Sequence, residues 1–161
     1  MLAPSVRVRL SSQKPGTSIM AVRASQSLSE RSPGGTRAPL HVTAAGKLFL
    51  LEQGPARLRD YAKRTGLAPQ TRNTLSSVPL LERELERIQR LGWAADDEEA
   101  ELGVRCVAAG IRDDGSALVA ALSLSCPAER MQPQWGPLVK ETAARISHAI
   151  GHRPGSRLDV A

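Results

Sequence analysis

An acidic stretch that leads into a cysteine carries the side chains of this sequence that are best suited to chemistry. The run of acids begins at Asp96, and Cys106 follows within an apolar segment. Farther along, Ser123 and Ser125 are separated by one residue, so their side chains would share one face of an extended strand. An acid, a thiol and two hydroxyls could serve catalysis, or they could form the polar wall of a small-ligand pocket.

Catalysis by a thiol requires an accessible cysteine whose pKa is lowered by its surroundings. The apolar run around Cys106 should raise the pKa of this thiol, and the sequence places no histidine close to it. A packed structural cysteine is therefore favoured over a nucleophile. Cys126 lies beside a predicted strand, and the absence of more cysteines favours two free thiols in a reducing cytoplasm over a disulfide.

Metal and cofactor motifs are missing from the sequence. His41, His148 and His152 are scattered, and a glycine expected to end a helix separates the last two. The segment 44–47 lacks the first glycine of a phosphate-binding loop and the serine or threonine that follows its lysine. We therefore expect neither a metal site nor any other cofactor.

A helix start supplies a further candidate for ligand binding. Thr43 is a suitable N-cap, and the small residues Ala44, Ala45 and Gly46 follow it. Small side chains leave the first-turn N–H groups open to a carboxylate, which a helix N-terminus attracts. Close packing of the helix against a sheet would require the same small residues, so both interpretations remain open.

The remaining pattern predicts the elements that must position these groups. A Pro-Gly turn joins strands over 6–10 and 17–23, and an Asp-Gly turn joins strands over 104–111 and 117–125. Gly and Pro punctuate four helices, which are expected over 43–50, 54–65, 77–91 and 133–150. The charged outer face of the helix over 77–91 is expected to be solvated.

Composition limits the classes of function. The net charge of +6 is concentrated in residues 1–40, while the rest of the chain is nearly balanced, so this part alone should not bind DNA. Two tryptophans, one tyrosine and one phenylalanine leave little for stacking on bases. No apolar run reaches the roughly 18 residues of a membrane span, so we expect no membrane association.

Several short segments together resemble one family, the C-terminal effector-binding domain of IclR-type bacterial transcription regulators. The resemblance covers about residues 6–151. It rests on residues 39–47 (PLHVTAAGK), 71–74 (TRNT), 85–94 (LERIQRLGWA), 97–99 (DEE) and 103–109 (GVRCVAA).

The resemblance implies an α+β, GAF-like fold, in which helices flank a curved antiparallel sheet. In the family, a winged helix-turn-helix precedes this domain, and it is absent from the sequence given. Residues 1–5 would then belong to the boundary, 6–151 to the effector-binding domain and 152–161 to a loose tail. DNA would be bound only through the missing domain, by a homodimer or homotetramer.

The resemblance also implies a non-enzymatic site for a small organic acid. Family members hold the carboxylate of the ligand at the positions of Ala44 and Ala45. The polar wall of the pocket then corresponds to Asp96, Cys106, Ser123 and Ser125. A GAF-like thiol enzyme that acts on a small metabolite through Cys106, with Cys126 as its second thiol, is the alternative.

Overall fold

The computed structural model describes residues 18–23, 29–31 and 37–154. The predicted strand over 6–10, its Pro-Gly turn, the boundary residues 1–5 and most of the expected tail lie outside the described residues. None of the helices in the described part is long and apolar enough to cross a membrane.

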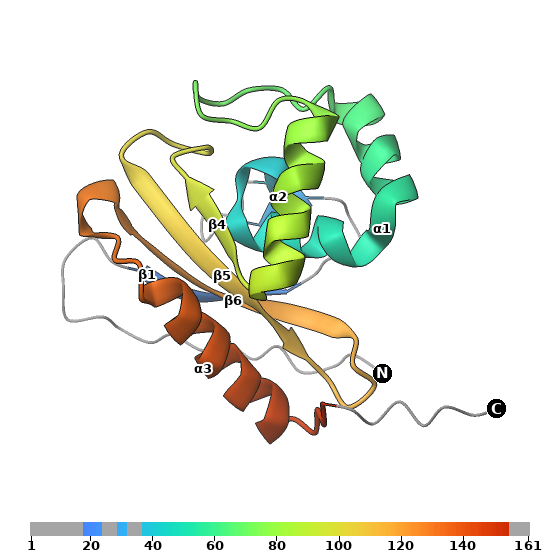
Figure 1. Cartoon of the computed structure of the whole chain (residues 1–161), viewed down its shortest axis with the longest axis vertical. Helices are drawn as coiled ribbons and strands as arrows, with labels where there is room; N and C mark the ends of the chain where they lie inside the picture. The colour runs from blue at the N-terminus through green and yellow to red at the C-terminus, as the bar shows by residue number, and fades with distance from the viewer. Residues whose placement is uncertain (1–17, 24–28, 32–36, 155–161) are drawn as a thin grey trace.

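A four-stranded antiparallel sheet forms the centre of the fold, with the strand order β1-β6-β5-β4 (Figure 1). The four strands are β1 (Ser18–Arg23), β4 (Ala94–Asp97), β5 (Val104–Arg112) and β6 (Leu118–Pro127). Two further strands, β2 (Ser29–Arg31) and β3 (Arg37–Pro39), pair with each other. The α+β class and the antiparallel sheet are thus confirmed.

The turn between β5 and β6 was predicted from its Asp-Gly pair, and it is present. The Oδ1 atom of Asp113 accepts a hydrogen bond from the N–H of Ala117 at 2.9 Å. The left-handed conformation falls on Ser116, with φ of 64°, and Gly115 does not adopt a positive φ. The turn therefore joins the strands as expected, but with a different residue in the strained position.

The described residues also form three α-helices and two short 3-10 turns, Leu40–Val42 and Ala128–Arg130. The helices are α1 (Ala44–Thr65), α2 (Val78–Leu91) and α3 (Trp135–Ala149). The two helices predicted over 43–65 form one kinked element, because Gly54 has φ of 79° and Pro55 follows it. Gly66 and Gly92 end α1 and α2 in the left-handed conformation, as their positions predicted.

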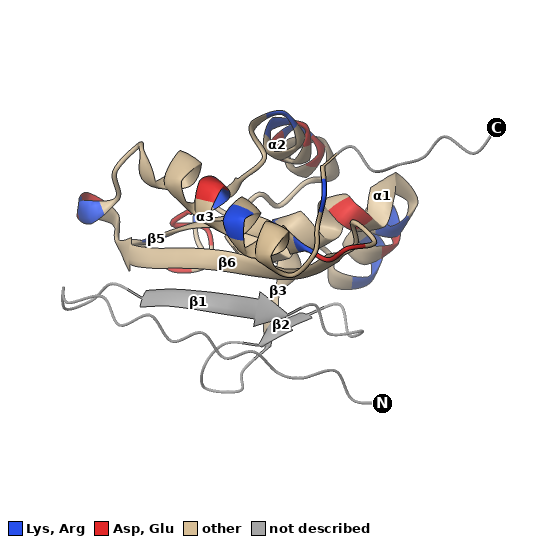
Figure 2. Cartoon of the chain, turned by 90° about the horizontal axis from the view of Figure 1, so that it is seen from below, with Lys and Arg blue, Asp and Glu red and all other residues tan. Residues whose placement is uncertain are grey.

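The helices cover the sheet from both faces (Figure 1). One apolar cluster joins α1 and α2 to the sheet residues Ala94, Ala108 and Ala121. A second cluster joins α3 to the opposite face, through Val107, Ala109 and Leu122. Figure 2 shows charged residues on the helices and loops, whereas β6 carries none. The sheet is thus buried on both sides, and α1 packs against one face of β4, β5 and β6.

Candidate ligand-binding site

The four polar side chains predicted as a pocket wall lie on one face of the sheet. Asp96 of β4 pairs with Cys106 of β5, and Cys106 pairs with Ser125 of β6. Ser123 lies two residues before Ser125 and faces the same way, opposite Ala108. Cys106 and Ala108 contribute to the apolar cluster under α1 and α2, so this polar wall looks toward those helices.

The first turn of α1 lies against the same face. Ala44 and Ala45 are buried in one cluster with Ala108. The predicted N-cap is confirmed, because the Oγ1 atom of Thr43 accepts a hydrogen bond from the Gly46 N–H at 3.0 Å. The amides of Ala44 and Ala45 belong to the first turn, where N–H groups have no acceptor within the helix.

Gly46 fixes this turn by close contact with the chain before it. A Cβ atom at this position would lie 2.6 Å from the Cα of Leu40 and 2.6 Å from the Oγ1 of Thr43. Because the first of these atoms belongs to the backbone, a side chain could be accommodated only by moving the helix start. Glycine at position 46 therefore determines where the first-turn amides point.

Asp96 organises the loop after β4 as well as facing the polar wall. Its Oδ1 accepts hydrogen bonds from the N–H groups of Glu99 at 2.7 Å and Ala100 at 3.3 Å. Burial raises the pKa of Asp96 to about 6, and the charge of Glu99 adds to this effect. The two backbone hydrogen bonds and Lys47 act in the opposite direction without cancelling it.

Replacing Asp96 with asparagine is expected to stabilise the fold at neutral pH. The folded state binds the proton of Asp96 more tightly than the unfolded chain, whose pKa is about 4. The contribution of Asp96 to the free energy of unfolding therefore falls as the pH rises from about 4 to about 6, and this contribution is constant above that range. An asparagine can keep both hydrogen bonds without the buried charge.

Urea unfolding at two pH values checks this expectation. Asp96→Asn should raise the free energy of unfolding at pH 7 by about 1–2 kcal/mol and leave it nearly unchanged at about pH 4. Asp60→Asn, which removes an exposed carboxylate, serves as the control. Equal effects of Asp96→Asn at both pH values would show that its charge is not disfavoured by folding.

Glu99 belongs to the run of acids that begins at Asp96, and its side chain is buried. Its Oε1 accepts a hydrogen bond from the Nζ of Lys47 at 2.6 Å. Lys47 is itself fully buried, and its ammonium also donates to the carbonyl oxygen of Ala95 at 2.8 Å. The ion pair ties the first turn of α1 to the end of β4, beside the polar wall.

A sequence signal for this pair existed only on the lysine side. Lys47 stands one turn after Ala44 and beside Leu48, on the face of α1 that packs inward. A lysine on that face needs a buried partner, but no pattern identifies Glu99 among four neighbouring acids.

The thiols and the buried histidine do not form a catalytic group. Cys106 faces α1, whereas Cys126 lies on the opposite face of the sheet and is not in a disulfide. Burial raises the pKa of Cys126. His41 is occupied elsewhere, because its Nδ1 lies 2.9 Å from the hydroxyl of Tyr61 and its Nε2 lies 3.2 Å from the Ala68 carbonyl. Because the two thiols lie on opposite faces of the sheet, this geometry does not support the formation of a disulfide between them during catalysis.

Solved structures share this architecture. The transcriptional regulator YaiJ matches with a TM-score of 0.76 and 27% identity, over 84% of this chain and 86% of that one. The IclR protein of Thermotoga maritima matches with a TM-score of 0.70 and 31% identity, over 85% and 62% of the two chains. The class of protein is thus that of transcription regulators whose matching parts have this fold.

A third structure shows the same fold at lower identity. It is a double mutant of the inducer-binding domain of the transcription factor PobR from Acinetobacter, in complex with 3-hydroxybenzoic acid. It is 23% identical, with a TM-score of 0.71, over 82% of this chain and 87% of that one.

The family profile described as "Bacterial transcriptional regulator IclR C-terminal" matches residues 5–148, and the chain belongs to this family. The predicted family is therefore confirmed. The repressor AllR of Klebsiella pneumoniae is 39% identical over 127 residues, which are 76% of this chain and 47% of that protein. AllR of Escherichia coli K12 is 39% identical over 124 residues, which are 74% and 46%. The chain spans about half the length of these relatives, which are named as transcriptional repressors.

Proposed function

We propose that this domain senses a small organic acid and that the bound acid changes operator binding by the full-length regulator. The observation that carries the proposal is the meeting of two kinds of group on one face of the sheet. The first-turn amides of Ala44 and Ala45 lie over that face, and the polar wall of β4, β5 and β6 lies on it.

The chemistry of this face suits a short acid. The helix N-terminus attracts a carboxylate, since its amides lack partners and its dipole favours negative charge. The hydroxyls of Ser123 and Ser125 can donate to a second oxygen of the ligand. The small side chains of Ala94, Ala108 and Ala121 make the surface of the sheet beneath the helix flat and apolar. Small-ligand sites commonly have apolar walls of this kind.

The relatives support the proposed partners of the whole protein. These are named as helix-turn-helix transcriptional repressors, so DNA would be bound by a domain that precedes this one in a longer protein. A homodimer or homotetramer would carry the signal between domains. The bound state of the PobR domain shows that the fold accepts an organic acid in that protein.

Thermal shift and calorimetry with a panel of small acids test the proposal. The panel should contain aliphatic, 2-oxo, 2-hydroxy and aromatic acids, each with its amide as an uncharged control. At least one acid should raise the melting temperature, and its amide should not. If no acid in the panel stabilises the protein, the sensing role is wrong.

Substitutions on the polar wall then test where the acid binds. Ser123→Ala combined with Ser125→Ala should weaken binding by about tenfold to a hundredfold, because two hydrogen bonds to the second oxygen of the ligand are lost. Ser76→Ala, an exposed serine before α2, is the matched control and should bind normally. Equal affinity of the double variant and the control would place the acid elsewhere.

A further inference from the structure

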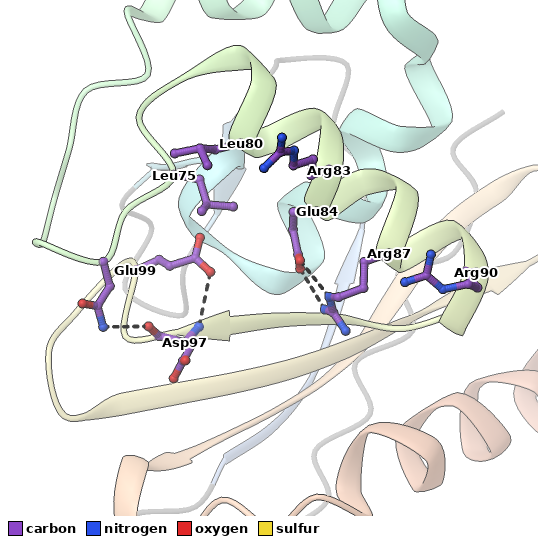
Figure 3. Close-up of a pocket in the computed structure, with 9 residues that line it drawn as sticks. Leu75, Leu80, Arg83, Glu84, Arg87, Arg90, Asp97 and Glu99 are labelled. Carbon is purple, nitrogen blue, oxygen red and sulfur yellow. Dashed lines mark hydrogen bonds and ion pairs between the residues drawn. The ribbon is translucent and has the colours of Figure 1, made fainter.

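A cavity of about 750 Å³ lies between α2 and the end of β4 (Figure 3). Leu75 and Leu80 line one side of it, Arg83 and Glu84 come from α2, and Glu99 comes from the loop after β4. The charged face of α2 was expected to be solvated, and Arg83, Glu86 and Arg90 are exposed. Glu84 and Arg87 are instead half-buried, because they turn toward Lys47 and Trp93.

Glu99, which lines this cavity, has an unused acceptor. The residue is only 6% exposed. Its Oε1 is bonded to Lys47 at 2.6 Å and lies 3.4 Å from the N–H of Asp97. In the part of the chain that the structure describes, Oε2 is buried and has no hydrogen-bond partner. A buried acceptor left unpaired is costly, so a donor at this atom would stabilise the site.

The neighbouring acid does not share this need. Both oxygens of Glu84 are taken by Arg87, whose Nε and Nη2 donate to them at 2.7 and 2.8 Å. This forked pair satisfies Glu84 and holds Arg87 against the helix. The donor that enters the cavity is therefore directed to Glu99 and not to Glu84.

The rim of the cavity offers the opposite charge. Arg83 is exposed, and no hydrogen bond or ion pair of its guanidinium occurs among the described residues. In Figure 3 it lies on α2 next to Glu84, on the side of the apolar residues Leu75 and Leu80. Leu80 is 48% exposed, which leaves an apolar surface between the acceptor and the cation.

We propose that this cavity binds a small zwitterion, whose ammonium donates to the Oε2 of Glu99 and whose carboxylate pairs with Arg83. The apolar part of the ligand lies against Leu75 and Leu80. An ammonium suits the position because a charge-assisted hydrogen bond to a carboxylate is stronger than a neutral one. This site adjoins the polar wall, because the N–H of Glu99 donates to Asp96, but its two charged groups are not those proposed to bind the acid.

A length series of ω-amino acids provides the test, since it samples the span between the two charges. Glycine, β-alanine, 4-aminobutyrate and 5-aminopentanoate are titrated into ¹⁵N-labelled protein, and amide shifts are followed by NMR. At least one member should give saturable shifts at Leu75, Arg83 and Glu99. Butyrate and butylamine, which each carry one of the two charges, should bind at least about tenfold more weakly.

Surface variants keep the test independent of folding. Arg83→Gln should weaken binding by about tenfold or more, whereas Arg57→Gln, which removes an exposed arginine of α1, should not. Glu99→Gln is a second variant, but it also disturbs Lys47, so Arg83→Gln decides. The proposal is overturned if no amino acid gives saturable shifts, if butyrate binds equally well, or if Arg83→Gln binds as the wild type does.

Discussion

Replacing Lys47 with methionine is expected to lower the free energy of unfolding by about 3–5 kcal/mol, the usual cost of removing one partner of a buried ion pair. The ammonium of Lys47 is fully buried and donates to Glu99 and to the Ala95 carbonyl. Its loss leaves the carboxylate of Glu99 buried without a cation. Urea unfolding at pH 7 measures the effect.

A double substitution separates the charge from the packing. Lys47→Met together with Glu99→Leu removes both charges and should recover most of the lost stability, because a buried pair replaced by apolar groups is often nearly neutral. Glu52→Gln breaks the more exposed pair with Arg112 and should cost less than about 1 kcal/mol. If Lys47→Met costs no more than Glu52→Gln, the pair does not hold α1 to the end of β4.

Gly46→Ala is expected to destabilise the fold by about 3 kcal/mol and to abolish binding of the acid. The added Cβ would meet the backbone of Leu40 and the Thr43 hydroxyl at distances that no relaxed structure tolerates. The start of α1 must then move, and the first-turn amides with it. Chemical unfolding measures the stability, and calorimetry measures the binding.

Another glycine supplies the matched control for this expectation. At Gly115 an added Cβ would lie 3.4 Å from the nearest atom, which belongs to the Asp113 side chain. Gly115→Ala should therefore change stability by less than about 1 kcal/mol and leave acid binding intact. Normal binding by a folded Gly46→Ala variant would show that the helix start does not hold the ligand.

The ends of the helices and the central hairpin could be predicted because local chemistry determines them. Thr43 caps α1 through its own hydroxyl, and Gly66 and Gly92 end helices in a conformation that glycine adopts readily. The strand β4 was not predicted, since it is short and contains two aspartates, which disfavour strands. Its pairing with β5 is a tertiary contact that overrides this preference.

The candidate site likewise contains residues that could be predicted from the sequence and residues that could not. Strand alternation was sufficient to place Ser123 and Ser125 on one face, and antiparallel pairing adds Cys106 to it. The partnership of Lys47 with Glu99 joins residues far apart in the sequence, and no periodicity links them. The cavity beside α2 was missed for the same reason, because it forms only when the preceding chain folds against the helix.

A crystal structure of the protein with the acid that gives the largest thermal shift tests the sensing site most directly. We expect its carboxylate within hydrogen-bond distance of the N–H groups of Ala44 and Ala45. The rest of the ligand should then contact Cys106, Ser123 or Ser125. An acid bound away from the start of α1, for example at Arg83 in the cavity beside α2, would contradict the proposed position of the acid site.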